Sequence, residues 1–275
     1  MTDVADPVPP TPFDLADTLG ADICALAAEH GLPHKHAVQA LVSLMGKLVV
    51  EPNSVFETSP EYVRDIGESG TTVPLVQSVH QFFDVLRARA SRRDFGTDPL
   101  EVGRLQSLLH WTVGSRGTTI AYDWRDAPQR FVPSAGGLAS IDAYVIANHI
   151  DGLEAGAYYF DYRRGFVEIG KGFMAQRVAG LMPGQEWLSR ASAVVVFVGN
   201  LDRLTHKYGV MAFKLLMLDA GVAAGHAELV ATALELRATI LGGLPSDRLA
   251  RLLGLDNEWQ VPLATLAVGT RSGHE

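Results

Sequence analysis

The segment from residue 209 to residue 236 constrains the fold more than any other part of the chain. It reads GVMAFKLLMLDAGVAAGHAELVATALEL and follows directly on Lys207 and Tyr208. At about 1.5 Å per residue, its 28 residues would form a helix of roughly 40 Å, the width of a whole domain. Because the segment is apolar on nearly every side, it predicts a buried central helix rather than a surface helix.

Two glycines in this segment, Gly221 and Gly225, are four residues apart and therefore lie on one side of the predicted helix. Since glycine has no side chain, a second helix can pack against that side at short range. A buried helix of this length indicates a core that continues into another subunit. The sequence therefore predicts a homodimer.

The charge and the cysteine content of the chain exclude several classes of protein. The formal net charge is −8, which argues against a nucleic-acid partner because phosphate contacts need an excess of Lys and Arg. The single cysteine, Cys24, excludes a disulfide framework and a cysteine-based metal site. His30, His34 and His36 are close in sequence, but without further ligands they indicate a polar loop, and no metal is predicted.

Nothing in the sequence indicates export or a membrane partner. The first residues, MTDVADPVPPTP, are acidic and rich in proline, unlike a secretory signal. Charged side chains interrupt the longest apolar runs before they reach the roughly 20 residues of a membrane span. The sequence therefore predicts a cytoplasmic protein.

The chain divides into three parts. Residues 1–12 contain four prolines and predict a disordered leader. Residues 13–77 predict a small helical N-terminal unit followed by a linker, because apolar residues recur there at helical spacing. Residues 78–275 form the predicted main domain.

The main domain mixes helices with strands. Amphipathic patterns predict helices at 79–91 and 100–114. Runs of strand length, rich in β-branched and aromatic residues, occur at 141–148, 156–161, 165–170, 192–200 and 262–269. Helices around a sheet of about five strands predict an α+β fold.

An unusual group of arginines lies in RARASRRDF, residues 87–95, of this otherwise acidic chain. Arg89, Arg92 and Arg93 surround Ser91 and would repel one another unless an anion or carboxylates lie close by. Arginine donates in a bidentate way to phosphate oxygens, so the group is a candidate phosphate clamp. The alternative is a solvated helix end.

Two glycine-containing turns can bring backbone amides close to a flat ligand. The first is the loop Pro133, Ser134, Ala135, Gly136 and Gly137, and the second contains Gly242 and Gly243. The sequence around Ser134 lacks the G-x-S-x-G pattern that surrounds a hydrolase nucleophile, so that role is not predicted. Each turn alone is a weak signal.

The order of these motifs resembles the FMN-dependent nitroreductase-like superfamily, and within it the SagB-type dehydrogenases that oxidise azolines in ribosomally made peptides. The resemblance covers about residues 80–270. It rests on RASRRDF, PSAGG, GLEAGAYYF, KYG, DAG in the long helix, GGLPSDRLARLLGLD and the closing strand. It implies a nitroreductase-like fold, with a central mixed or antiparallel sheet, flanking helices and FMN at a homodimer interface.

The resemblance also implies roles for individual residues. Arg89, Ser91 and Arg93 match the positions that hold the FMN phosphate, ribityl chain and pyrimidine edge. Residues 133–136 match the loop along the flavin, and residues 242–243 match the turn that faces the reactive N5. Arg271 is expected to add a phosphate contact. The chain departs from the SagB pattern on the substrate side, for example at Asp142, where Glu is common.

Lys207 and Tyr208 match the pair implicated in proton removal in these dehydrogenases. An azoline becomes an azole by losing a proton, which either side chain would accept, and a hydride, which would pass to flavin N5. A neighbouring ammonium favours the phenolate form of a tyrosine. The alternative is that Lys207 begins a helix and Tyr208 only packs against the core.

Three functions therefore remain open. The first is FMN-dependent dehydrogenation of a peptide substrate, within a set of biosynthetic enzymes and with oxygen reoxidising the flavin. The second is an NAD(P)H-dependent nitroreductase or flavin reductase. The third is a flavin-binding scaffold of a biosynthetic complex without catalytic activity.

Overall fold

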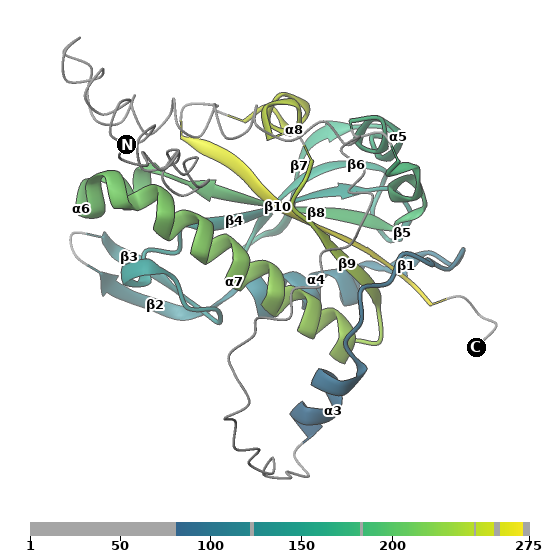
Figure 1. The fold of residues 1–275 in the computed structure, drawn as a ribbon, viewed down its shortest axis with the longest axis horizontal. Coiled ribbons are helices and arrows are strands. Elements are labelled where there is room, and N and C mark those ends of the chain that lie inside the picture. The colour runs from purple at the N-terminus through teal and green to yellow at the C-terminus, as the bar shows by residue number, and fades with distance from the viewer. Residues whose placement is uncertain (1–80, 122–123, 182–183, 245, 256–258, 272–275) are drawn as a thin grey trace, which may run out of the picture.

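A computed structural model describes residues 81–121, 124–181, 184–244, 246–255 and 259–271. The predictions for the leader, residues 1–12, and for the N-terminal unit, residues 13–77, lie outside the described residues. The described part is one α+β domain (Figure 1), which confirms the predicted fold class.

A six-stranded antiparallel sheet runs through the domain, in the order β7-β6-β4-β8-β10-β9. The strands are β4 (Ile141–Ala147), β6 (Gly156–Asp161), β7 (Gly165–Lys171), β8 (Ala193–Asn200), β9 (Arg237–Leu241) and β10 (Gln260–Gly269). Five of them match the predicted runs, and β4 and β8 are buried at every residue. The sixth, β9, was not predicted, because its five residues directly follow the apolar segment and carry no separate pattern.

Helices cover both faces of the sheet. On one face lie α4 (Val102–Val113) and α7 (Ala212–Ala233), and on the other lie α5 (Ala175–Ala179) and α8 (Ser246–Leu253). The short helix α6 (Asp202–Tyr208) connects β8 to α7 through one 3₁₀ turn, η3 (Gly209–Met211).

The remaining elements are short. Helix α3 (Gln81–Ala88) precedes β1 (Leu100–Glu101), which pairs in parallel with β5 (Ile150–Asp151). The antiparallel strands β2 (Ser115–Ala121) and β3 (Trp124–Arg130) form a separate two-stranded sheet. The 3₁₀ turns η1 (Ala135–Gly137) and η2 (Glu186–Arg190) complete the described elements. Strands β2 and β3 were not predicted, because glycine, proline and charged residues are frequent in them.

Helix α7 corrects the prediction made from its sequence. It has 22 residues instead of 28, because Gly209, with φ of 53°, interrupts the chain before it and β9 begins soon after it. Only about half of its circumference is buried. The outer stripe, defined as Met211, Leu218, Gly221 and Val222, is exposed along the preceding turn and the helix itself.

The apolar character of α7 therefore has two sources, an inner face in the core and an uncovered outer face. By length and hydropathy α7 is also the one described helix that could cross a membrane. In this fold it packs instead on the sheet, where Gly199 of β8 makes room for it. A Cβ atom at Gly199 would come within 2.7 Å of the Leu216 side chain.

Candidate functional site

Two buried carboxylates lie on opposite edges of the buried face of α7. Asp219 and Glu228 are nine residues apart, which on a helix is about 13 Å along the axis and roughly 180° around it. They lie at the two borders of the buried face, and the outer stripe lies between them on the solvent side. The segments that contact these carboxylates are therefore held on opposite edges of one helix.

The predicted small-residue loop is held at the Asp219 edge. The backbone N–H of Ala135 donates to both oxygens of Asp219 at 3.0 Å, and the Ser140 hydroxyl donates to one of them at 2.6 Å. Gly136 has a φ of 60°, in the left-handed region that glycine adopts without strain. Pro133 and Gly136 are exposed, so the outer backbone of the loop faces solvent.

A second anchor holds the end of this loop. The Ser134 hydroxyl accepts the N–H of Ala139 at 3.0 Å. Ala139 has a φ of 50°, a conformation that costs an L-residue about 1–2 kcal/mol and that the surrounding contacts must enforce. The Ser134 side chain thus stabilises the conformation of the loop.

The arginine segment separates into two directions. At the Glu228 edge, Arg89 lies 3.5 Å and Ser91 lies 3.4 Å from the carboxylate oxygens. The Arg93 guanidinium instead lies 5.3 Å from the centre of the Trp187 ring, in a cation–π contact. The structure therefore places Arg89 and Ser91 together and Arg93 apart from them.

Only Arg87 and Ala88 of the segment belong to a helix, so the helix predicted to run to residue 91 ends earlier, and residues 89–95 lie outside helices and strands. Helix α3 ends at Ala88, and the N–H of Arg92 donates to the carbonyl of Ala238 in β9 at 2.8 Å. The Arg89 side chain remains 41% exposed, so its guanidinium is accessible to a ligand. Glu228 forms an ion pair with Arg89 and so offsets part of the positive charge of the segment. The sequence did not predict this role.

The second glycine turn and Arg271 lie at opposite ends of the paired antiparallel strands β9 and β10. Gly242 and Gly243 directly follow β9, and no described atom lies within 4 Å of where a Cβ of Gly242 would be. Arg271 is exposed beyond the end of β10. There the N–H of Gly96, directly after the arginine segment, donates to the carbonyl of Thr270 at 2.9 Å.

Lys207 and Tyr208 end α6, which the turn η3 connects to α7. The Lys207 Nζ lies 4.8 Å from the centre of the Tyr208 ring. Tyr208 is half-buried against the core cluster on the α7 face of the sheet, whereas Lys207 is exposed. The pair therefore combines an amine that meets solvent with a phenol that packs against the core.

A buried charge cluster connects α6 with the small-residue loop. Asp142 of β4 contacts Arg203 of α6 at 2.7 Å, Arg130 of β3 at 3.2 Å and the Asn200 amide at 3.0 Å. Burial lowers the pKa of Arg130, partly offset by Asp142. Burial also lowers the pKa of Arg203, but the charge and hydrogen bonds of Asp142 outweigh it and raise that pKa overall.

The cluster also affects a neighbouring phenol. Burial, reinforced by the charge of Asp142, raises the pKa of Tyr159 to about 12, so Tyr159 stays neutral. Asp142 appears in the sequence only as a departure from the SagB pattern. Arg130 and Arg203 stand in no motif, and no sequence signal pointed to them.

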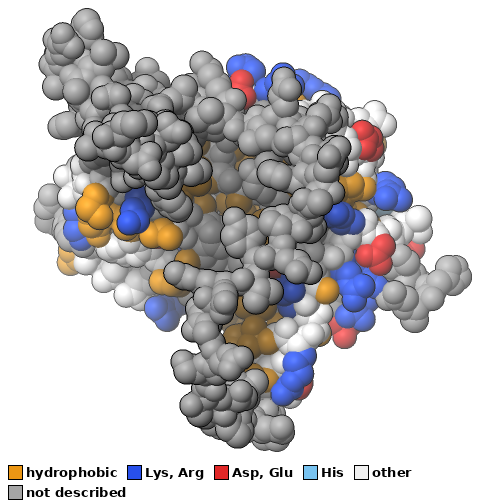
Figure 2. Space-filling model, viewed as in Figure 1, with side chains coloured by type: hydrophobic (Ala, Val, Ile, Leu, Met, Phe, Trp, Pro, Cys, Tyr) orange, Lys and Arg blue, Asp and Glu red, His pale blue; other side chains and the backbone are white. Residues whose placement is uncertain are grey.

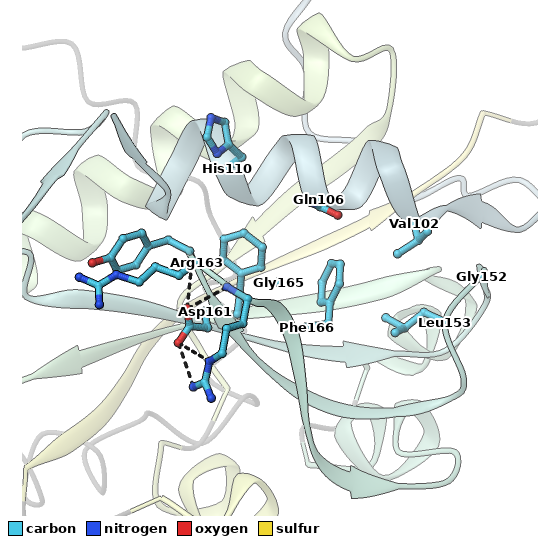
Figure 3. Close-up of a pocket in the computed structure, with 12 residues that line it drawn as sticks. Val102, Gln106, His110, Gly152, Leu153, Asp161, Arg163, Gly165 and Phe166 are labelled. Carbon is cyan, nitrogen blue, oxygen red and sulfur yellow. Dashed lines mark hydrogen bonds and ion pairs between the residues drawn. The ribbon is translucent and has the colours of Figure 1, made fainter. Parts of the chain in front are cut away.

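A described pocket of about 420 Å³ lies elsewhere, between α4 and the turn that joins β6 to β7 (Figure 3). Phe166 and Gln106 line opposite walls of the pocket. The Arg164 guanidinium, also in its lining, donates a hydrogen bond to Asp161. None of the residues that the sequence singled out lines this pocket. The candidate site is therefore the surface along α7.

This arrangement, a six-stranded antiparallel sheet with a long helix that carries a small-residue loop and an arginine segment, defines an α+β domain of the nitroreductase-like class. The chain belongs to the nitroreductase family, whose model, described as "Nitroreductase family", matches residues 86–270. It is a family of flavin oxidoreductases.

Known proteins agree with this assignment. A protein of Methanocaldococcus jannaschii named as a nitroreductase is 27% identical over 189 residues, 68% of this chain and 90% of that one. The crystal structure of another protein so named, from Anabaena variabilis, has a TM-score of 0.57 at 23% identity. That match covers 69% of this chain and 38% of the longer one.

Two further structures share the fold. The Escherichia coli microcin synthetase McbBCD complex, with truncated pro-MccB17 bound, aligns with a TM-score of 0.59 and 17% identity over 84% of this chain and 92% of that one. A nitroreductase-like protein of Desulfovibrio desulfuricans in complex with FMN aligns with a TM-score of 0.50 and 16% identity. The coverage is 70% of this chain and 88% of that one.

The Asp219 contacts predict a large effect on stability. Replacing Asp219 by Ala leaves the Ala135 N–H and the Ser140 hydroxyl without their buried acceptor, and we expect the free energy of unfolding to fall by about 2–4 kcal/mol. Urea denaturation at one fixed protein concentration measures this change. In the control Asp247→Ala, which removes an exposed ion pair with Arg251, the loss should stay below about 1 kcal/mol. Equal losses in the two variants would contradict the assigned role of Asp219.

Proposed function

We propose that this protein is an FMN-dependent dehydrogenase that oxidises an azoline ring in a peptide to an azole. The observation that carries the proposal is the Lys207–Tyr208 pair at the head of α7, the helix that also anchors the small-residue loop. The likeness to the McbBCD microcin synthetase complex, whose structure contains a bound pro-peptide, supports it. Its partners would be the peptide and other enzymes that act on the same peptide.

The exposed residues fit an FMN molecule. Arg89 and Ser91 supply a cation and a hydroxyl suited to a phosphate and its chain, with Arg93 and Arg271 on neighbouring segments. The outer backbone of residues 133–136 and the open turn at Gly242 and Gly243 suit a flat ring. FMN, when bound, supplies the two-electron acceptor that no side chain of this protein can provide.

We further propose that the FMN lies between two copies of the chain. The loop at Asp219 and the arginines at Glu228 lie on opposite edges of α7, so one chain presents them on separate sides. A second copy placed over the outer stripe would meet both edges. No described atom lies within 4 Å of a Cβ at Gly221 or Gly225, which leaves room for a helix of the partner.

Exposure of the outer stripe supports the same assembly. Leu218 is 56% exposed, and Met211 and Val222 are exposed beside it. Figure 2 shows hydrophobic side chains on this face of the molecule, gathered over the start of α7. Apolar side chains in one strip are a common mark of a protein–protein interface.

The proposed chemistry removes a proton and a hydride from two neighbouring ring atoms of the azoline. The proton passes to the phenol oxygen of Tyr208 or to the Nζ of Lys207, whichever is deprotonated, and then to solvent. A bound FMN would supply the two-electron acceptor for the hydride, with molecular oxygen as the terminal acceptor, reduced to hydrogen peroxide.

The names of the relatives favour a second candidate, an NAD(P)H-dependent nitroreductase or flavin reductase. Both candidates need the same cofactor, so they differ in the electron donor. If NADH or NADPH is the donor, the nicotinamide takes the place of the peptide and Lys207 and Tyr208 have no proton to remove.

An anaerobic reduction assay distinguishes the two. The purified protein should be yellow, and its absorbance near 450 nm should bleach on adding a thiazoline- or oxazoline-bearing peptide, with an azole as product by mass spectrometry. Bleaching by NADPH alone, with the peptide unchanged, would instead establish the nitroreductase reading. A colourless protein that takes up no added FMN would reject both.

A further inference from the structure

We propose that Arg203 is a positioning residue that fixes helix α6, and with it the Lys207–Tyr208 pair, against the loop that would hold the flavin. The inference rests on the proposed function in one respect, that this pair acts on the substrate. Its subject, Arg203, stands in none of the motifs identified in the sequence.

Arg203 makes three hydrogen bonds from one guanidinium. Its two terminal nitrogens donate to the two oxygens of Asp142, at 3.0 and 2.7 Å, as a bidentate fork. The first of these nitrogens also donates to the carbonyl of Ala139 at 2.6 Å. Three contacts in fixed directions restrict the guanidinium far more than a single ion pair would.

The partner of Arg203 is itself immobile. The Asp142 side chain is 5% exposed and belongs to β4, a strand inside the sheet. It is also held by Arg130, whose side chain is 8% exposed, and by the amide of Asn200 at the end of β8. Arg203 therefore ties α6 to a rigid point rather than to a loop.

Helix α6 needs such a tie because it has only seven residues. A helix this short is unstable alone and takes its position from tertiary contacts. Leu204, which is completely buried, and Tyr208, which is half-buried, give α6 apolar contacts with the core. Apolar contacts have no preferred direction, whereas the hydrogen bonds of Arg203 do, so Arg203 restricts rotation and tilt of the helix.

Orientation of α6 determines where the pair points. Lys207 is four residues after Arg203, so the two side chains share one side of the helix. A rotation of α6 would displace Lys207 and Tyr208 together. Because the geometry of a reacting pair tolerates little error, a shift of about 1 Å can reduce a rate on the order of 100-fold.

The same guanidinium reaches the small-residue loop. Ala139, which accepts a hydrogen bond from Arg203, donates its own N–H to Ser134, and the next residue, Ser140, donates to Asp219 of α7. Arg203 thus sets the distance between the proton-accepting pair and the loop. Arginine is required for this, because lysine carries the same charge but has no planar fork.

The variant Arg203→Lys tests the proposal because it keeps the charge beside Asp142 and removes the fork. We expect kcat for peptide oxidation to fall by about 10- to 100-fold, with KM and FMN content unchanged within about two-fold. We also expect hydrogen exchange of the backbone amides in residues 202–208 and 134–140 to become about tenfold faster, with and without FMN. The matched control is Arg251→Lys, since Arg251 pairs with Asp247 on the surface of α8.

Each outcome decides one question. Unchanged kcat in Arg203→Lys, or slower turnover without faster exchange in α6, would overturn the positioning role. If the unaltered protein oxidises no peptide, the proposed function fails. The positioning role of Arg203 is then tested by hydrogen exchange alone. Faster exchange in both segments then supports it, and exchange equal to that of Arg251→Lys overturns it.

Discussion

Replacing Tyr208 by Phe is expected to slow peptide oxidation by about 10²- to 10⁴-fold while the flavin stays bound. The variant removes only the phenol oxygen and preserves the ring, which packs against the core and lies under the Lys207 ammonium. Stopped-flow measurement of flavin bleaching by the peptide under anaerobic conditions gives the rate, and the absorbance spectrum gives the flavin content. Lys207→Ala should act in the same direction, because it removes the other proposed proton acceptor beside the Tyr208 ring.

A nearby residue on the same helix supplies the control. His206 is exposed, and its ring lies beside the carbonyl of Asp202, inside α6. His206→Ala should leave the rate within about two-fold, because the interaction of its ring is with the Asp202 carbonyl and not with Lys207 or Tyr208. Undiminished turnover in both Tyr208→Phe and Lys207→Ala would remove the proposed proton transfer.

Replacing Leu218 by Arg is expected to separate the proposed dimer and to release the flavin. In the proposed assembly Leu218 is covered by the second copy, so the new guanidinium would be buried without a partner. Such a charge costs several kcal/mol, which weakens association at least about 100-fold. Sedimentation equilibrium measures the association, and ultrafiltration followed by absorbance measures retained FMN.

The control places the same charge at another exposed apolar side chain, away from the outer stripe. Phe173 is 73% exposed and follows β7, at the sheet edge far from α7 in the strand order. Phe173→Arg should retain both the dimer and the flavin. A dimer that survives Leu218→Arg would show that the outer stripe is not the interface.

Local patterns were sufficient to predict most of the fold. Five of the six strands of the sheet are runs of β-branched and aromatic residues, and burial of every residue in β4 and β8 explains why those two runs are continuous. The burial of α7 was overestimated, because hydropathy does not distinguish an apolar side chain in the core from one on the surface. Strand β9 was missed because nothing separates it in sequence from α7.

The candidate site was predictable only where one short motif carries it. The glycine loop, the arginine segment and the Lys207–Tyr208 pair were identified by residue type and order. Their long-range partners were not, since Glu228 is 137 residues from Ser91 and Asp142 is 61 residues from Arg203. The direction of Arg93, toward Trp187, depends on the same kind of tertiary contact and has no local signal.

The uncovered half of α7 has a consequence for how the protein behaves after synthesis. If Leu218 and Val222 are satisfied only by a second copy, completion of folding and encounter of two chains are one equilibrium, governed by mass action. The melting temperature should then rise with the protein concentration. Dilution would leave isolated chains with the apolar outer stripe exposed to water. Such chains would bind chaperones or aggregate.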